Sequence, residues 1–408
     1  TPLDAEIEKS LYFQYLKTIY QITEAKDTKA SIVSEGHILL IDDEENKGWS
    51  NFFLKLKSSN SKLKIESIGK DFKSLDSKDN IIAVCENKIR DSKFKPHTII
   101  LDLRLHDSDF EEDDPTKLTG FKVLEKIKKE INPGIQVILF TASNKVWNYQ
   151  ALKKIGFDGW ITKESPESIS DKYSTKNIIE ELINSIENAL ERKYLKEIFL
   201  NTRIIKNIRL GNKKGDSNKT KELKFQIKQN LDYAFILCND DNTIEFALFV
   251  YLQILELYCN FFTYRDKKSS KAIVYKNLKD REAKTNGYII YEVKENKIHS
   301  NYKYKKGFYN FQKNKKKIKD EQFIDYSCEE FIYQNDNRFF SFALKLASIL
   351  DIQLNDISKL SNLMELIFIR NNKIAHKGQN FDDTKRKFKK EDNKKFFELI
   401  HKLLNNAL

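Results

Sequence analysis

The sequence predicts a doubly wound α/β domain followed by a mainly α-helical domain. Between about residues 36 and 163, short apolar runs alternate with amphipathic stretches, which is typical of parallel strands joined by helices. Several of the apolar runs end in polar side chains, and parallel sheets bind ligands at this edge. After about residue 222, apolar residues recur at helical spacing and predict a helical bundle.

The predicted regions follow one another in a simple order along the chain. Residues 1–30 have apolar side chains at helical spacing, which predicts an amphipathic helix. The α/β domain spans residues 31–198, and its last helix continues as a connector. Residues 199–221 form this helical connector and a polar, glycine-containing linker. The helical domain spans residues 222–408, and residues 266–335 form a basic, Tyr-rich, irregular insertion with one strand-like run.

The composition of the 408 residues is that of a globular protein without a membrane segment. No uninterrupted apolar segment reaches the roughly 20 residues that cross a bilayer, and the first residues lack a signal pattern, so we expect a cytoplasmic protein. The four cysteines are scattered, which favours reduced, structural thiols. The net charge of +12 is concentrated in the C-terminal half. It suits a polyanionic partner, or it reflects only the solvation of a Lys-rich surface.

Five polar residues close the predicted strands of the α/β domain. Asp42 and Asp43 follow HILLI, Asp102 follows TIIL, Thr141 closes VILFT and Lys163 closes DGWITK. Three neighbouring carboxylates repel one another unless a hard cation lies between them, and Mg²⁺ suits an all-oxygen pocket. A carboxylate flanked by a hydroxyl and an ammonium is suited to accept a phosphoryl group, because the ammonium and Mg²⁺ neutralise the incoming charge.

These residues resemble the receiver domain of bacterial response regulators, over roughly residues 36–198. The resemblance implies a five-stranded parallel sheet with Asp102 as the phosphoacceptor and a histidine kinase as the phosphodonor. It implies that Mg²⁺ is held by Asp42, Asp43, Asp102 and the backbone carbonyl of Arg104. It also implies that the phosphoryl group is bound by Thr141 and Lys163, with Trp160 as the aromatic switch residue.

The chain departs from the receiver pattern at two places. The segment between Leu105 and Gly120 is long and rich in acids, and Lys163 is not followed by the usual proline. A receiver that keeps the fold without being phosphorylated therefore stays an alternative.

A second group of polar residues lies in LMELIFIRNNKIAHKG, residues 363–378. On a straight helix, Arg370 and His376 lie about 120° apart, so they converge only if the helix breaks or a second copy supplies the partner. Asn371 and Asn372 favour a break, because asparagine caps helices well. A histidine can move a proton at a ribose 2′-hydroxyl or 5′-oxygen, and an arginine can stabilise the charge of the phosphate.

This motif is similar to the R-x(4–6)-H motif of HEPN domains, which are helical bundles. The resemblance implies a dimeric, metal-independent endoribonuclease without a cofactor, in which Arg370, Asn371 and His376 form the catalytic site and RNA is the substrate. The alternative is a non-catalytic domain in which Arg370 and His376 only cap helices.

Together, these resemblances predict a signalling protein whose receiver controls a homodimeric, HEPN-like output domain. The alternative is a non-catalytic response regulator whose helical domain binds RNA, a nucleotide or a protein. A DNA-binding regulator is a third possibility. It is disfavoured because no helix-turn-helix pattern follows the receiver in the sequence.

Overall fold

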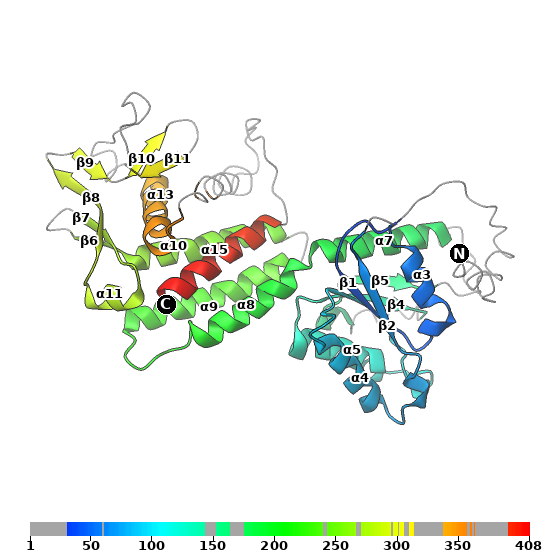
Figure 1. The fold of residues 1–408 in the computed structure, drawn as a ribbon. Coiled ribbons are helices and arrows are strands. Elements are labelled where there is room, and N and C mark those ends of the chain that lie inside the picture. The colour runs from blue at the N-terminus through cyan, green and yellow to red at the C-terminus, as the bar shows by residue number, and fades with distance from the viewer. Residues whose placement is uncertain are drawn as a thin grey trace. The chain divides into compact units, whose positions relative to one another are not determined.

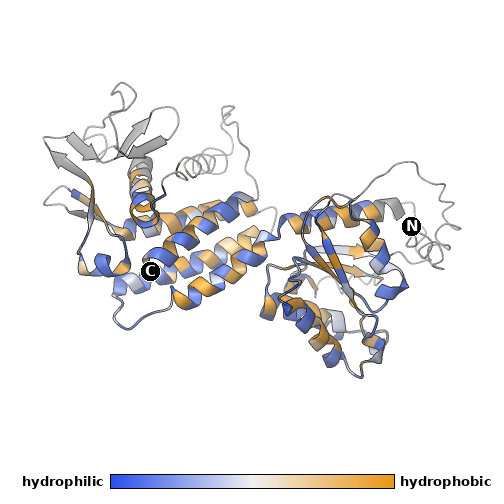
Figure 2. Cartoon of the chain, in the orientation of Figure 1, coloured by the Kyte–Doolittle hydropathy of each residue, from blue (hydrophilic) through white to orange (hydrophobic). Residues whose placement is uncertain are grey.

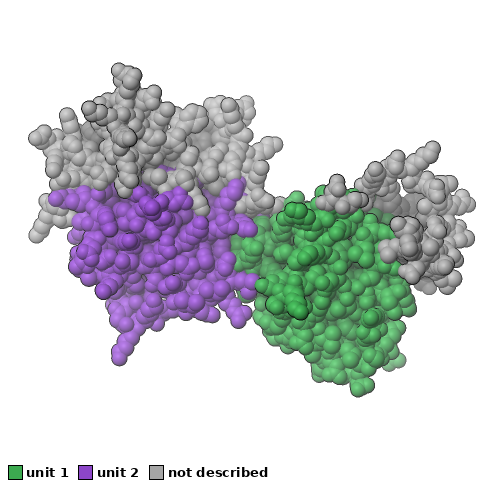
Figure 3. Space-filling view, in the orientation of Figure 1, with its two compact units in different colours: residues 1–199 green, residues 200–408 purple. Residues whose placement is uncertain are grey.

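The computed structural model of the chain describes residues 31–58, 61–142, 152–163, 175–239, 243–266, 271–294, 297–300, 302–305, 310–313, 338–356, 360, 363 and 391–408. The chain divides into two compact units, residues 1–199 and 200–408 (Figure 3). The amphipathic helix predicted for residues 1–30 lies outside the described residues.

The first unit is built on a five-stranded parallel sheet (Figure 1). The sheet has the order β2-β1-β3-β4-β5, which is one of the orders of doubly wound α/β folds. The five-stranded parallel sheet predicted from the sequence is therefore confirmed. Its strands are β1 (His37–Ile41), β2 (Lys64–Ile68), β3 (Thr98–Leu101), β4 (Gln136–Thr141) and β5 (Gly159–Thr162).

Both faces of the sheet are covered by helices, so the central strands are apolar on both sides. In β1, Leu39 and Ile41 pack toward α4 (Lys78–Arg90) and α5 (Thr119–Lys126). Ile38 and Leu40 pack on the opposite face, toward α3 (Trp49–Lys55) and α7 (Thr175–Glu191). Figure 2 shows the matching pattern in the helices, each of which carries hydrophobic and hydrophilic residues. The sheet is thereby fixed between two apolar layers, and its strand ends stay free to form a site.

The segment that the sequence predicts as one long helix, residues 176–209, is two helices, α7 and α8 (Tyr194–Ile208). The start of α8 is hydrogen-bonded to loops that precede β3 and β4, at the edge of the sheet opposite to the carboxyl ends of the strands. Lys196 Nζ donates to Pro96 O (2.7 Å), and Asn132 Nδ2 donates to Lys196 O (3.0 Å). Because no glycine or proline marks the break at residues 192–193, the helical periodicity alone does not reveal it.

The second unit contains helices packed around a central helix, α10 (Ala247–Phe262). Helix α10 contacts α9 (Asn218–Cys238), α13 (Arg338–Ile349) and α15 (Glu391–Ala407). Inside this core, the Tyr258 hydroxyl donates to Gln353 Oε1 (2.6 Å). The helical region that the sequence predicts after the α/β domain is confirmed in these described elements.

One segment among the described residues, Ile244–Phe262, is long and apolar enough to cross a bilayer by length and composition. Half of this segment is buried inside the protein. Its buried residues, such as Tyr251, Leu255 and Phe262, face the neighbouring helices of the unit. The apolar composition therefore fits the central position of α10 in the core.

The described part of the 266–335 insertion is more regular than the sequence indicates. An antiparallel sheet has the order β6-β7-β8-β9, formed by Thr263–Asp266, Lys271–Val274, Tyr288–Lys294 and Lys297–Ser300. A second pair joins β10 (Tyr302–Lys305) and β11 (Asn310–Lys313), and α11 spans Leu278–Ala283. Only β8 coincides with the predicted strand-like run. The other strands are four residues long, which is too short to show a period in the sequence.

Candidate functional site

The predicted strand-end residues of the first unit lie at one edge of its sheet. Asp42 follows β1, Asp102 follows β3, Thr141 ends β4 and Lys163 follows β5, and all four are buried. Backbone hydrogen bonds extend the parallel pairing to these positions: Asp102 N donates to Ile41 O (2.9 Å), and Lys163 N donates to Thr141 O (2.8 Å). All five strands run in the same direction, so their carboxyl ends lie at the same edge of the sheet.

The Lys163 ammonium joins the carboxylates of two different strands. Its Nζ donates to Asp42 Oδ2 (2.7 Å) and to Asp102 Oδ2. Burial by itself lowers the pKa of Lys163, but the negative charges of Asp102 and Asp42 outweigh it and raise the pKa above its usual value. Lys163 is therefore charged and compensates part of the negative charge of the pocket.

The three carboxylates of the pocket exceed the charge that Lys163 supplies. Carboxylate oxygens of Asp42, Asp43 and Asp102 lie within 4.8 Å of one another. Burial, together with the negative charges of the neighbouring Asp102 and Asp42, raises the pKa of Asp43 to about 6. Burial also raises the pKa of Asp42, against the opposing effect of Lys163. Buried, all-oxygen and short of positive charge, this set of donors fits Mg²⁺.

The backbone after β3 is arranged around Asp102. Asp102 Oδ1 accepts hydrogen bonds from Leu103 N (2.6 Å) and Arg104 N (3.3 Å). Gly120 packs directly on this turn, and a Cβ atom at that position would lie 2.2 Å from Asp102 O. Its amide donates to Leu103 O (3.0 Å). Because α5 approaches this turn so closely, residue 120 must be glycine. Metal binding by the Arg104 carbonyl stays a prediction.

Trp160, the predicted switch residue, lies within β5 and pairs with Leu139 of β4. Its half-buried indole packs beside the core cluster on the α4/α5 face, and its ring centroid is 5.9 Å from that of Phe157. The indole Nε1 donates to Thr162 Oγ1 (3.2 Å). Trp160 thus lies three residues before Lys163, which directly follows β5. The role of Trp160 as a switch stays a prediction.

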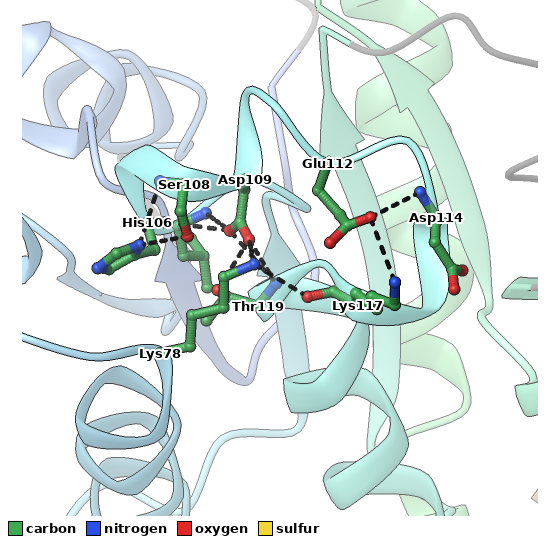
Figure 4. Close-up of polar contacts among 9 residues, drawn as sticks. Lys78, His106, Ser108, Asp109, Glu112, Asp114, Lys117 and Thr119 are labelled. Carbon is green, nitrogen blue, oxygen red and sulfur yellow. Dashed lines mark hydrogen bonds and ion pairs between the residues drawn. The ribbon is translucent and has the colours of Figure 1, made fainter.

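The acidic segment between Leu105 and Gly120 is folded around one buried carboxylate, Asp109 (Figure 4). Asp109 Oδ2 accepts from Leu105 N (3.0 Å), and Oδ1 accepts from the Thr119 hydroxyl (3.1 Å). Lys78 Nζ, at the start of α4, lies 2.6 Å from Asp109 Oδ1. The charge of Asp109 is therefore compensated by Lys78 of α4, and Asp109 is not among the carboxylates grouped with Asp102.

Other acids of this loop also make local contacts (Figure 4). Glu112 Oε1 accepts from Asp114 N (3.0 Å), as Figure 4 shows. Asp114 Oδ1 accepts from Thr116 N (2.9 Å). Asp107 and Glu111 stay exposed. The loop is thus an ordered structure, which its acidic composition alone does not predict.

Two aromatic residues that sequence reasoning did not single out border Lys163. Lys163 Nζ lies 5.5 Å from the ring centroid of Trp49 and 5.3 Å from that of Phe140. Phe140 directly precedes Thr141, and Trp49 begins α3. The signal in the sequence was their nearness to predicted strand-end residues: Phe140 precedes Thr141, and Trp49 comes six residues after Asp43.

The residues of the second predicted site, Arg370, Asn371 and His376, lie outside the described residues. Their predicted convergence and catalytic roles therefore stay predictions, and so does the HEPN-like assignment.

Comparison with known proteins gives matches to solved structures only. No protein-family model matches the chain, and no curated protein does. The signal receiver domain of a modulated diguanylate cyclase from Desulfovibrio desulfuricans is 16% identical and covers 40% of this chain and 98% of its own, with a TM-score of 0.26. A receiver domain of a Francisella response regulator is 19% identical and covers 39% and 98%, with a TM-score of 0.25.

A phosphorylated phytochrome response regulator from a cyanobacterium is 17% identical and covers 41% of this chain and 94% of its own, with a TM-score of 0.26. These scores are low, so the assignment of the first unit rests on its own sheet. Residues 37–162 have the five-stranded parallel α/β fold that the receiver resemblance predicts.

Proposed function

We propose that residues 36–198 are a phosphorylation-responsive receiver in which Asp102 accepts a phosphoryl group from a histidine kinase. The observation that supports this most strongly is the contact of one buried ammonium, Lys163, with the carboxylates of Asp42 and Asp102 at the strand-end edge. A structural ion pair needs one carboxylate, whereas this pocket holds three and one lysine. The excess of acids is the pattern of a site that binds a cation and transfers a charged group.

In the proposed reaction, an oxygen of the Asp102 carboxylate attacks the phosphorus of a phosphohistidine. A new O–P bond forms as the N–P bond of the donor breaks, and the electron pair of that bond stays on the imidazole nitrogen. The Lys163 ammonium and the Thr141 hydroxyl bind oxygens of the transferred group, and Trp160 responds to the new position of Thr141. Asp42, Asp43 and Asp102, with the Arg104 carbonyl, would hold Mg²⁺, which neutralises phosphoryl charge when bound.

The test is phosphorylation of the full chain by acetyl phosphate with and without MgCl₂, followed by intact-protein mass spectrometry. We expect one phosphoryl adduct on the wild type, none after chelation with EDTA and none on Asp102→Asn. Asp107→Asn, an exposed acid of the following loop, is the matched control and should be modified like the wild type. An unmodified wild type would mean a receiver that keeps the fold without the chemistry.

For the second unit we propose a dimeric, metal-independent endoribonuclease, on the basis of the Arg370–His376 motif in a basic helical domain. His376 would take the proton from a ribose 2′-hydroxyl, which attacks the neighbouring phosphorus and releases the 5′-oxygen. Arg370 would stabilise the charge on the phosphate, and Asn371 would orient the site. In a two-fold dimer, two copies of the motif would face one another, so a receiver could control the site by shifting the pairing.

The ribonuclease proposal is tested by incubating the purified chain with RNA in EDTA. We expect cleavage by the wild type and none by Arg370→Ala or His376→Ala. His401→Ala, on α15, is the histidine control and should cleave normally. RNA binding without cleavage by the wild type would favour the non-catalytic regulator, and equal cleavage by all variants would exclude the motif as the catalytic site.

A further inference from the structure

The Lys163 ammonium is surrounded by two kinds of partner. Its Nζ donates to Asp42 Oδ2 and Asp102 Oδ2. The rings of Trp49 and Phe140 border it as well, with centroids 5.5 and 5.3 Å from Nζ. Both distances are within the range in which a cation is attracted to the face of an aromatic ring.

The positions of these rings are fixed by other aromatic side chains. Trp49 and Phe140 meet edge to face, with centroids 4.8 Å apart and an interplanar angle of 87°. Phe53 packs against Phe140 in the same manner, at 5.6 Å and 80°. Trp49 also packs against Phe52, at 5.9 Å and 84°. Such contacts are a preferred geometry of aromatic pairs, so the rings form a rigid surface beside the ammonium.

The two kinds of partner respond differently to a bound divalent cation. The carboxylates of Asp42 and Asp102 are the groups that Mg²⁺ needs, so the metal competes with Lys163 for them and repels its charge. The aromatic rings carry no charge and do not bind Mg²⁺. A lysine that leaves the carboxylates can move further onto the rings, so its attraction to them is stronger in the metal-bound state than in the metal-free state, in which the carboxylates hold it.

We propose that Trp49 is a positioning residue for Lys163. With Phe140 it forms an aromatic seat that keeps the ammonium at the pocket when a divalent cation occupies the carboxylates. The ammonium is then available to the incoming phosphoryl group. This inference rests on the proposed receiver function and adds a residue that the receiver resemblance does not include.

The experiment measures Mg²⁺ binding to the full chain by isothermal titration calorimetry. Trp49→Leu removes the aromatic face, Trp49→Met replaces it with a longer, unbranched apolar side chain of about the same volume as leucine, and Trp49→Phe restores a ring. We expect Trp49→Leu and Trp49→Met to bind Mg²⁺ about threefold to tenfold more weakly, the range set by cation–π energies, and Trp49→Phe to bind nearly as the wild type does. Circular dichroism and thermal unfolding establish that each variant is folded, and Trp49→Met replaces Trp49→Leu if the latter is not.

A double-mutant cycle separates positioning from packing. In a Lys163→Met background, replacing Trp49 by leucine or methionine should no longer change Mg²⁺ affinity, because there is no ammonium left to hold. With saturating Mg²⁺, acetyl phosphate should modify Trp49→Met more slowly than Trp49→Phe.

Three outcomes would overturn the inference. The first is wild-type Mg²⁺ affinity in the folded Trp49→Met protein, and the second is an equal loss of affinity with and without Lys163, which would mark a packing effect. If either occurs while the wild type still binds Mg²⁺ and is phosphorylated, the inference alone fails. The third is a wild type that binds no Mg²⁺, which would remove the inference together with the receiver function.

Discussion

Replacing Asp43 by asparagine is expected to stabilise the metal-free first unit at pH 8 and to have little effect near pH 4. Asp43 is 7% exposed and shares its pocket with Asp42 and Asp102. Its carboxylate is therefore deprived of water and close to two other acids, while Lys163 donates to those two. Asparagine keeps the shape of the side chain and removes its charge.

The magnitude follows from the pKa of Asp43, which rises from 3.8 to about 6 in the folded chain. The folded state then binds the proton more tightly than the unfolded state does, so stability falls as pH rises between these two values. Above pH 6 the ionised carboxylate destabilises the fold by about 3 kcal/mol, at 1.36 kcal/mol per pKa unit. Below the unfolded pKa, both states are protonated and this contribution disappears.

The assay is urea unfolding followed by tryptophan fluorescence in EDTA. All three tryptophans, Trp49, Trp147 and Trp160, belong to residues 1–199, so their emission follows the first unit. We expect Asp43→Asn to raise the free energy of unfolding at pH 8 by up to about 3 kcal/mol and to lose this advantage as the pH falls to about 4. In Mg²⁺, the wild type should gain stability and Asp43→Asn should not.

The control is Asp107→Asn, which changes an exposed acid. It should leave the free energy of unfolding within about 0.5 kcal/mol of the wild-type value at both pH values. An Asp43→Asn protein that is less stable than the wild type at pH 8 would refute the electrostatic reasoning. A gain that is equal at pH 8 and pH 4 would refute it as well.

Three further predictions concern the surroundings of the pocket. Gly120→Ala should cost about 3 kcal/mol or more and abolish phosphorylation, because the new Cβ meets the backbone of Asp102 and Leu103; unchanged urea unfolding would contradict this. Asp109→Ala should cost about 3 kcal/mol by leaving backbone amides and Lys78 without their acceptor, whereas Asp107→Ala in the same loop should be neutral; equal effects would contradict the loop structure. Lys163→Met should slow modification by acetyl phosphate, measured by mass spectrometry, and a wild-type rate would exclude Lys163 from phosphoryl binding.

The fold of the first unit was predictable because its central strands, β1, β3 and β4, are buried on both faces. Runs such as HILLI and TIIL contain only residues that suit a buried strand, and each ends in a polar residue that cannot continue into the core. The parallel direction then places these ends together, so Asp42, Asp102 and Lys163 could be grouped without knowledge of the register.

Other features depend on contacts that one segment of sequence does not contain. The inward position of Asp109 depends on Lys78, which comes from another helix, and the aromatic seat joins Trp49 to Phe140 across about ninety residues. The break between α7 and α8 depends on the packing of Lys196 and Asn132 rather than on a helix-breaking residue. The short strands of the second unit could not be predicted, because four residues are too few to show an alternation of apolar and polar side chains.

The most direct measurement of the central claim is the chemical identification of the phosphorylated residue. The chain is treated with acetyl phosphate and MgCl₂, the acyl phosphate is reduced with sodium borohydride, and the resulting homoserine is located by peptide mass spectrometry. The proposed function predicts homoserine at residue 102 only, with none in EDTA and none when Lys163 is replaced together with Asp43. Homoserine at another carboxylate, or at no position in the presence of Mg²⁺, would contradict it.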